Sequence, residues 1–112
     1  MRHAVVVAAL AAIVTLAALP AARAGDNPTL AEFLASCQSD SQKCLDSLTY
    51  GFEAAYEDMG EICPPQNLAE GDAAQTELRW MQNAAASNSA LANGTELDAE
   101  WTALHTLWPC GN

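Results

Sequence analysis

The chain has 112 residues, of which 51% are hydrophobic, and it carries a net charge of −10 at pH 7. This length suits one domain of modest size. A strongly acidic protein repels nucleic-acid phosphates and anionic lipid headgroups, which excludes nucleic acid as a partner and favours basic proteins or cationic surfaces.

The first 24 residues have the pattern of a secretory signal peptide. A basic start, MRH, precedes the uncharged run AVVVAALAAIVTLAALP, and the small residues of AARA predict cleavage after Ala24. The apolar run is short for a transmembrane anchor and is interrupted by Pro20, so we expect no stable membrane association after cleavage. The predicted exported domain, residues 25–112, keeps only Lys43 and Arg79 as basic side chains against all 14 acidic ones.

Apolar residues recur at helical spacing along the exported domain, and no convincing strand pattern is present. Thr29 and Glu32 have the spacing of a capping box and predict a short helix that runs to about Cys37. A second helix is predicted over residues 41–60, with Gly60 as its stop. Its expected core-facing residues are Leu45, Leu48, Phe52, Tyr56 and Met59.

Two further helices are predicted from capping pairs. Asp72 with Gln75 should cap the third helix, and Thr95 with Asp98 should cap the fourth, which Pro109 ends. The expected core positions are Leu78, Met81 and Ala85 in the third helix, and Leu97, Trp101, Leu104 and Trp108 in the fourth. The predicted fold class is therefore all-α, a small bundle of about four helices.

The exported domain contains four cysteines, Cys37, Cys44, Cys63 and Cys110, and an even number in an exported chain predicts disulfides. Cys44 and Cys63 flank the second helix and would lie roughly 28 Å apart. A disulfide requires Cα atoms within about 7 Å, and Cys37 lies at the same far end as Cys44. The predicted bridges are therefore Cys37 with Cys44 and Cys63 with Cys110.

Two similar segments, ICPPQN at residues 62–67 and the terminal LWPCGN, each place a proline beside a cysteine. Proline lacks an N–H and restricts the residue before it, so each proline should end a helix. Both thiols would then lie in extended segments that can meet, and their disulfide would join the end of the chain to the loop after the second helix.

The motifs FLASC, ICPP and the closing LWPC, with a cysteine opening a long helix and Gly51 within it, resemble the Rap/Tai family of small periplasmic immunity proteins. The resemblance covers essentially the whole exported domain. It implies an all-helical fold, a periplasmic location and a possible homodimer. It also implies that the protein binds a cognate amidase effector delivered by type VI secretion and occludes the cleft in which that enzyme cleaves peptidoglycan.

A second function class remains open from the residues alone, a small periplasmic chaperone of the acid-stress type, which is also exported and disulfide-bonded. The charge discriminates between the two classes. An acid-activated chaperone should lose a folded dimer as its carboxylates protonate, whereas an immunity protein held by disulfides should stay folded.

The residues do not predict an enzyme. His105 is the only histidine of the exported domain and lies at a core-like helical spacing, and no Cys-x-x-Cys pair suggests zinc or redox chemistry. We therefore expect no catalytic residue, no metal and no cofactor. The tripeptide NGT at Asn93 matches a glycosylation signal but is interpreted as turn chemistry.

The loop of residues 87–94 is the predicted effector-blocking segment, because the resemblance implies a projecting loop and SNSALANG is polar and nearly uncharged. The candidate effector-binding residues are Ser87, Asn88, Leu91, Asn93 and Glu96. Leu91, the one large apolar residue of the loop, is expected to be exposed. An ordinary connection is the alternative interpretation of this loop. The acidic face around Glu53, Glu57 and Glu61 is the alternative binding surface.

Overall fold

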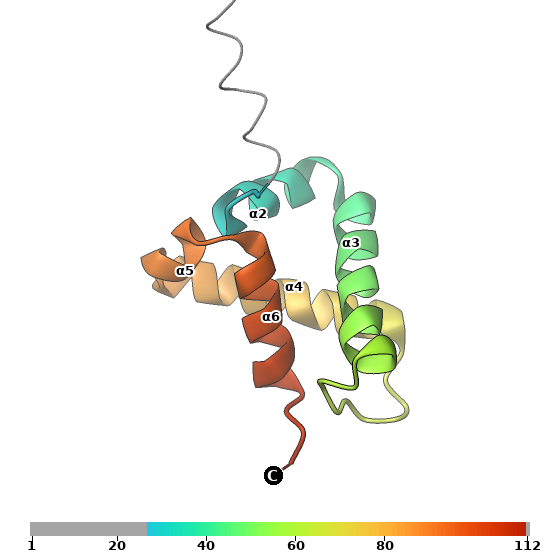
Figure 1. Ribbon diagram of the computed structural model, residues 1–112. Helices are drawn as coiled ribbons and strands as arrows, with labels where there is room; N and C mark the ends of the chain where they lie inside the picture. Colours follow the sequence, from blue (N-terminus) through green and yellow to red (C-terminus); the bar gives the residue numbers. More distant parts are fainter. Residues whose placement is uncertain (1–26, 112) are drawn as a thin grey trace, which may run out of the picture.

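The computed structural model describes residues 27–111, and within them the regular structure is helical (Figure 1). The α-helices are α2 (Leu30–Ser39), α3 (Ser41–Glu53), α4 (Glu70–Ser87), α5 (Ser89–Asn93) and α6 (Glu96–Leu107), and the π-helical turn η3 (Ala54–Asp58) extends α3. No strand occurs in this part of the chain, so the predicted all-α class is confirmed. The predicted signal peptide lies outside the described residues.

The helices α2 and α6 start side by side and are capped as the sequence predicted. The Thr29 hydroxyl accepts from the Glu32 amide at 3.1 Å while Glu32 accepts from the Thr29 amide at 2.9 Å, and Thr95 accepts from the Asp98 amide at 3.2 Å. The two capping segments are also joined to each other, because the Leu30 amide donates to the Gly94 carbonyl and the Glu96 amide donates to the Pro28 carbonyl, both at 2.9 Å. The start of α6 is therefore held in place against α2.

The predicted second helix forms α3 and η3. Asp40 ends α2 and caps α3, since its side chain accepts from the Lys43 amide at 3.1 Å, which makes a sharp corner between the two helices. The last turn widens into η3, and the helix stops before Gly60, whose φ of 65° favours glycine. The predicted stop is thus confirmed.

The predicted cap of the third helix is wrong. The helix α4 begins at Glu70, and its N-cap residue Ala69 has no side-chain acceptor. Asp72 and Glu70 lie in the first turn instead, where their negative charges favour the unpaired amides of the helix start. A turn in which the Leu68 amide donates to the Pro65 carbonyl at 3.1 Å starts the helix earlier than the capping pattern suggested.

Both predicted disulfides are present. Cys37 bonds to Cys44 across the α2–α3 corner with Cα atoms 5.0 Å apart, and Cys63 bonds to Cys110 with Cα atoms 4.8 Å apart. The Cys63 amide also donates to the carbonyl of Trp108 at 2.9 Å. The two Cys-Pro segments therefore meet as predicted, and α6 is fixed at its end as well as at its start.

Two hydrophobic clusters form the core of the described residues. The first joins α2, α3, α4 and α6, and its fully buried members include Leu30, Leu48 and Met81. The second surrounds Phe52 and Trp108, whose rings meet edge to face at 5.2 Å between centroids. We call this second cluster, together with the Cys63–Cys110 disulfide, the clasp.

The predicted core face of the fourth helix is half wrong. Leu104 and Trp108 are buried, but Leu97 is 64% exposed and Trp101 is 43% exposed. The buried stripe of α6 is instead Glu96, Ala99, Glu100, Ala103 and Leu104. Two alanines allow α6 to approach its neighbours closely, which turns the larger apolar residues outward and two glutamates inward.

The end of the predicted second helix shows a similar difference. Leu48 and Phe52 are buried as expected, whereas Tyr56 and Met59 are 37% and 53% exposed. The widened turn of η3 shifts the register of the residues after Glu53, since a π-turn adds a residue relative to the α-helical repeat. Both side chains therefore leave the core face that simple helical spacing predicts.

Candidate functional site

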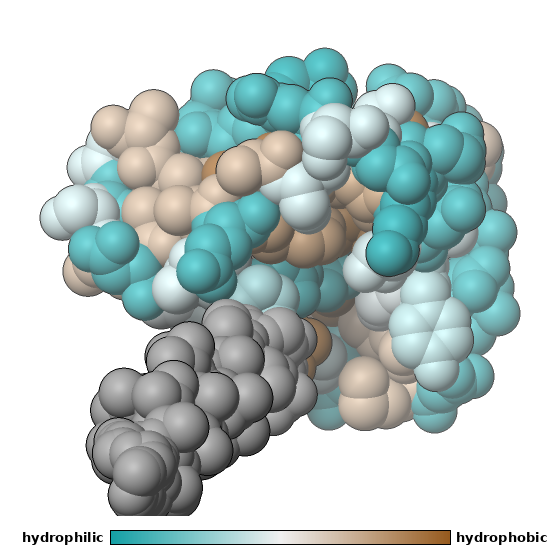
Figure 2. All heavy atoms as spheres, turned by 90° about the horizontal axis from the view of Figure 1, so that it is seen from above, coloured by the Kyte–Doolittle hydropathy of each residue, from teal (hydrophilic) through white to brown (hydrophobic). Residues whose placement is uncertain are grey.

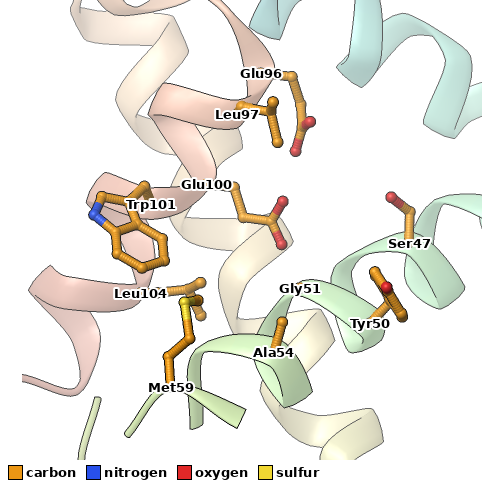
Figure 3. A pocket seen from close by; sticks show the side chains of 10 residues that line it. All are labelled: Ser47, Tyr50, Gly51, Ala54, Met59, Glu96, Leu97, Glu100, Trp101 and Leu104. Atoms are coloured by element: carbon orange, nitrogen blue, oxygen red, sulfur yellow. The ribbon is translucent and has the colours of Figure 1, made fainter. Parts of the chain in front are cut away.

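A cleft of about 280 Å³ lies between α3 and α6 (Figure 3). Its lining residues are Ser47, Tyr50, Gly51, Ala54, Met59, Glu96, Leu97, Glu100, Trp101 and Leu104. These include four large apolar side chains that are exposed in the described structure, Tyr50, Met59, Leu97 and Trp101. Exposed apolar side chains that gather around one hollow are typical of a binding surface.

Helical spacing explains why these side chains face one another. The residues that line the cleft from one side lie at positions 47, 50 and 51 of α3 and at position 54, where η3 begins, and they share one face. Those of α6 lie at positions 96, 97, 100, 101 and 104. The paired capping segments fix α6 at one end and the clasp fixes it at the other. The cleft is therefore positioned mainly by helices, and Met59, directly after η3, is its one lining residue outside them.

Glu100 forms part of the base of the cleft, and Figure 3 shows its carboxylate directed toward α3 near Gly51. The residue is only 7% exposed. A Cβ atom at position 51 would overlap the Glu100 carboxylate, so an alanine there would require the end of the Glu100 side chain to move. Glycine in a helix interior costs about 1 kcal/mol relative to alanine, and here the close approach of Glu100 explains it.

Glu77 from α4 and Glu96 from α6 complete a group of three buried carboxyls with Glu100, which we call the acid cluster. Glu77 is fully buried and Glu96 is 8% exposed. Both oxygens of Glu77 and the Oε2 atoms of Glu96 and Glu100 lack a hydrogen-bond partner when the groups are ionised. An unpaired buried charge is costly, so the cluster disfavours full ionisation.

The pKa values follow from this burial. Burial first, and the charge of Glu96 second, raise the pKa of Glu77 to about 8. Burial, followed by a hydrogen bond shared with Glu96, raises the pKa of Glu100 to about 9. At neutral pH both carboxyls are therefore mostly protonated, and a protonated carboxyl can donate a hydrogen bond to its neighbour where an ionised one cannot.

The candidate residues of the predicted blocking loop are separated by the structure. Residues 89–93 form the short helix α5, and the Asn88 side chain caps it by accepting from the Leu91 amide at 3.1 Å. Leu91 is half-buried and packs against the first cluster, so its expected exposure is wrong. Ser87, Asn88 and Asn93 are exposed.

Glu96 lies apart from the surface side chains of that loop. It is directed into the cleft on the α3 side of α6, whereas Figure 1 shows α5 on the opposite side of α6 from α3. The acidic residues of the alternative binding surface do not line the cleft. Glu57 and Glu61 are exposed after the end of α3, and Glu53 is half-buried. The structure therefore offers the cleft as a site that sequence reasoning missed.

Two signals in the sequence could have indicated this cleft. Gly51 interrupts a long helical pattern, which often marks a close approach by another group. Ala99 and Ala103 lie on the stripe of α6 that contains Glu96 and Glu100, and small residues at helical spacing allow close packing. If the core face of the fourth helix had been predicted on the side of Ala99 and Ala103, Glu96 and Glu100 would have been predicted to be buried.

His105 is half-buried beside Trp101, with 4.4 Å between ring centroids. Its Nδ1 atom lies 2.9 Å from the Trp101 carbonyl and its Nε2 atom lies 3.4 Å from Glu61 Oε1. The contact with Glu61 joins α6 to the segment that follows η3.

Residues 27–111 contain no group of three or more histidine, cysteine, aspartate or glutamate side chains placed to hold a metal ion. In the same residues, no helix combines the length and the apolar character needed to cross a bilayer. Comparisons of the chain with models of protein families, with curated proteins and with solved structures found no match.

Proposed function

We propose that this protein is a periplasmic immunity protein of the Rap/Tai type, which binds a peptidoglycan amidase delivered by type VI secretion and occludes its active site. The observation that carries the proposal is the cleft between α3 and α6, where four large apolar side chains are exposed on an acidic protein. The sequence motifs FLASC, ICPP and LWPC support the proposal. The cysteines of ICPP and LWPC bond to each other, and the cysteine of FLASC bonds to Cys44.

The two disulfides suggest an oxidising, exported environment. A peptidoglycan amidase delivered into the periplasm acts in such a compartment. The predicted signal peptide would take the protein to the same place, so inhibitor and enzyme would meet where the enzyme's substrate is found.

The exposed residues of the cleft have the composition of a protein interface. Tyrosine, tryptophan and methionine are enriched in such interfaces, and aromatic residues contribute much of the binding energy. Tyr50 is 75% exposed and Trp101 is 43% exposed, so both can be covered by a partner. The exposed residues Ser87, which ends α4, and Asn93, which ends α5, are proposed as a second, polar contact with the effector.

The acid cluster argues against the alternative of an acid-activated chaperone. Glu77 and Glu100 have raised pKa values, so protonation favours the folded state, and these groups make the fold more stable as the pH falls from about 9 toward 5. A chaperone released by acid needs the opposite dependence. We therefore favour the immunity function.

The test uses the purified cognate amidase, sought as the product of the adjacent reading frame, and this protein with both disulfides formed. We expect inhibition of peptidoglycan hydrolysis that is complete near one equivalent of this protein. Replacing four cleft side chains by serine (Tyr50, Met59, Leu97 and Trp101) should abolish inhibition in a variant that still melts cooperatively. Absence of inhibition by the wild-type protein, with the amidase active, would contradict the proposal.

The same preparation tests the expectation that the protein is not an enzyme. Without the amidase it should release no product from peptidoglycan or from simple esters. Turnover that survives repurification and disappears in a His105→Ala variant would show that this expectation is wrong.

A further inference from the structure

Building on the proposed function, we infer that the cleft between α3 and α6 receives one lysine or arginine side chain of the effector, whose cationic end pairs with Glu96 and Glu100. Both carboxylates are more than nine-tenths buried, both line the cleft, and each has an oxygen without a hydrogen-bond partner. Figure 3 shows both directed into the space between the two helices.

The protein's own basic side chains do not fill this role in the described residues. Lys43 lies beside Asp40 in a groove at the α2–α3 corner, and Arg79 lies on the exposed side of α4. The one salt bridge found within residues 27–111 joins His105 to Glu61. The acid cluster therefore has no cation of its own, although charge pairing would relieve the cost of burying it.

The walls of the cleft suit a long basic side chain. Leu97, Leu104 and Ala54 provide apolar surface for an aliphatic stem, and the carboxylates lie at the base where the charged end would arrive. Tyr50 and Trp101 expose aromatic rings at the edge of the cleft. Such rings attract cations, and arginine also stacks on them.

Charge identifies the occupant as a foreign basic protein and not a second copy of this chain. Two copies would bring together two strongly acidic surfaces, which repel one another. Each copy could offer only Lys43 or Arg79 from its predicted exported domain. A basic rim around the active site of an effector would instead be attracted to this face.

Proton release gives the pairing a distinctive signature. The groups that face Glu100 are Glu77 from α4 and Glu96 from α6, whereas α3 contributes uncharged residues and the titratable Tyr50 to the cleft. His105 is already engaged with Glu61. A bound cation favours the ionised carboxylates, so binding should release protons near pH 7 and become tighter as the pH rises toward 9.

The first experiment needs no effector. The oxidised protein is titrated with n-butylguanidinium and, as a neutral isostere, with n-butylurea, while the amide signals of Gly51 and Ala54 and the indole signal of Trp101 are followed by NMR. We expect saturable shifts at these signals and binding of the guanidinium at least about tenfold tighter than binding of the urea. Equal affinities, or shifts confined to other regions, would overturn the inference.

Matched variants separate the cleft from general electrostatic attraction. Glu96→Gln with Glu100→Gln should reduce guanidinium binding to that of the urea, and Glu100→Gln alone should reduce it in part. Asp58→Asn removes a charge from an exposed side chain after α3 and should leave the affinity within about twofold of the wild type. An equal loss in Asp58→Asn would overturn the inference. Cooperative melting of each variant confirms that it is folded.

The second experiment distinguishes this inference from the proposed function. The affinity of the cognate amidase is measured for the wild type and for Glu100→Gln, together with proton uptake or release in two buffers of different ionisation enthalpy. We expect at least about tenfold weaker binding of the variant and proton release only with the wild type. If Glu100→Gln inhibits the amidase fully, with the same affinity and the same proton release as the wild type, the immunity function would stand and the lysine or arginine pairing would be overturned.

Discussion

The clasp and the acid cluster both fix α6 against the rest of the molecule, but they do so with opposite chemistry. The clasp combines a disulfide with the edge-to-face pair of Phe52 and Trp108, so its members are covalent or apolar. The acid cluster buries three carboxyls, Glu77 of α4 and Glu96 and Glu100 of α6. The clasp stabilises the fold at any pH, whereas the acid cluster reduces stability whenever it is ionised. The acid cluster therefore needs a reason other than stability, and the inferred pairing with a basic side chain would supply one.

The largest expected effect concerns the clasp. Replacing Cys63 and Cys110 by serine should lower the free energy of unfolding by about 4 kcal/mol, because the bond closes a long loop. Urea denaturation at pH 7 measures the loss. The matched variant without Cys37 and Cys44, which are 7 residues apart, should lose about 2.5 kcal/mol. An equal or larger loss in the matched variant would contradict the importance assigned to the clasp.

The acid cluster should make stability depend on pH. Glu77 has a pKa of about 8 in the folded protein and an ordinary value of 4.5, so the folded state retains a proton that the unfolded state releases. This contribution is fully present below about pH 4.5 and is lost as the pH rises through 8. At about 1.4 kcal/mol per pKa unit, Glu77→Gln should be more stable than the wild type by about 2 kcal/mol at pH 9, allowing for structural relaxation.

Denaturation curves between pH 5 and 9 test this prediction. The wild type should lose stability across that range, and Glu77→Gln should lose less. Stability of the wild type that increases from pH 5 to 9 would show that the acid cluster is not protonated as inferred. Variants of the clasp should keep the pH dependence of the wild type, since the clasp contains no titrating group.

Two glycine-to-alanine substitutions, one in α3 and one in α4, test the close approach of Glu100 to α3. Gly51→Ala should lower the free energy of unfolding by about 1 kcal/mol, because the new Cβ displaces the Glu100 carboxylate and this cost exceeds the gain in helix propensity. Gly71→Ala is the control in the first turn of α4, where a Cβ meets no atom within 4 Å and helix propensity favours alanine. Thermal melting compares the two. Equal stability of both variants would indicate that Glu100 does not lie against Gly51.

The smallest expected effect concerns the edge of the cleft. Leu97→Ser should change the free energy of unfolding by less than about 0.5 kcal/mol, since Leu97 is 64% exposed. If Leu97 faced the core, as helical spacing alone predicted, the same change would cost several kcal/mol. Chemical denaturation distinguishes these outcomes and decides which face of α6 is buried.

The sequence by itself determined the local features of this protein. Capping pairs at Thr29 and Thr95, the stop at Gly60 and both disulfide pairings were predictable, because each depends on residues close in the chain or on the length of one helix. The predicted cap at Asp72 was wrong because the turn before α4 starts the helix earlier.

Only the tertiary structure decided which face of α6 is buried and where the candidate site lies. Leu97, Trp101, Leu104 and Trp108 form a plausible apolar stripe. Periodicity alone does not choose between it and the stripe of Ala99 and Ala103, which packs into the first cluster with residues of α2, α3 and α4. Because the alanine stripe of α6 faces the core, Leu97 and Trp101 are exposed and Glu96 and Glu100 are buried. The physical reason is that close packing depends on the shapes of several helices together. The sequence of one helix therefore does not determine which of its faces fits against its neighbours.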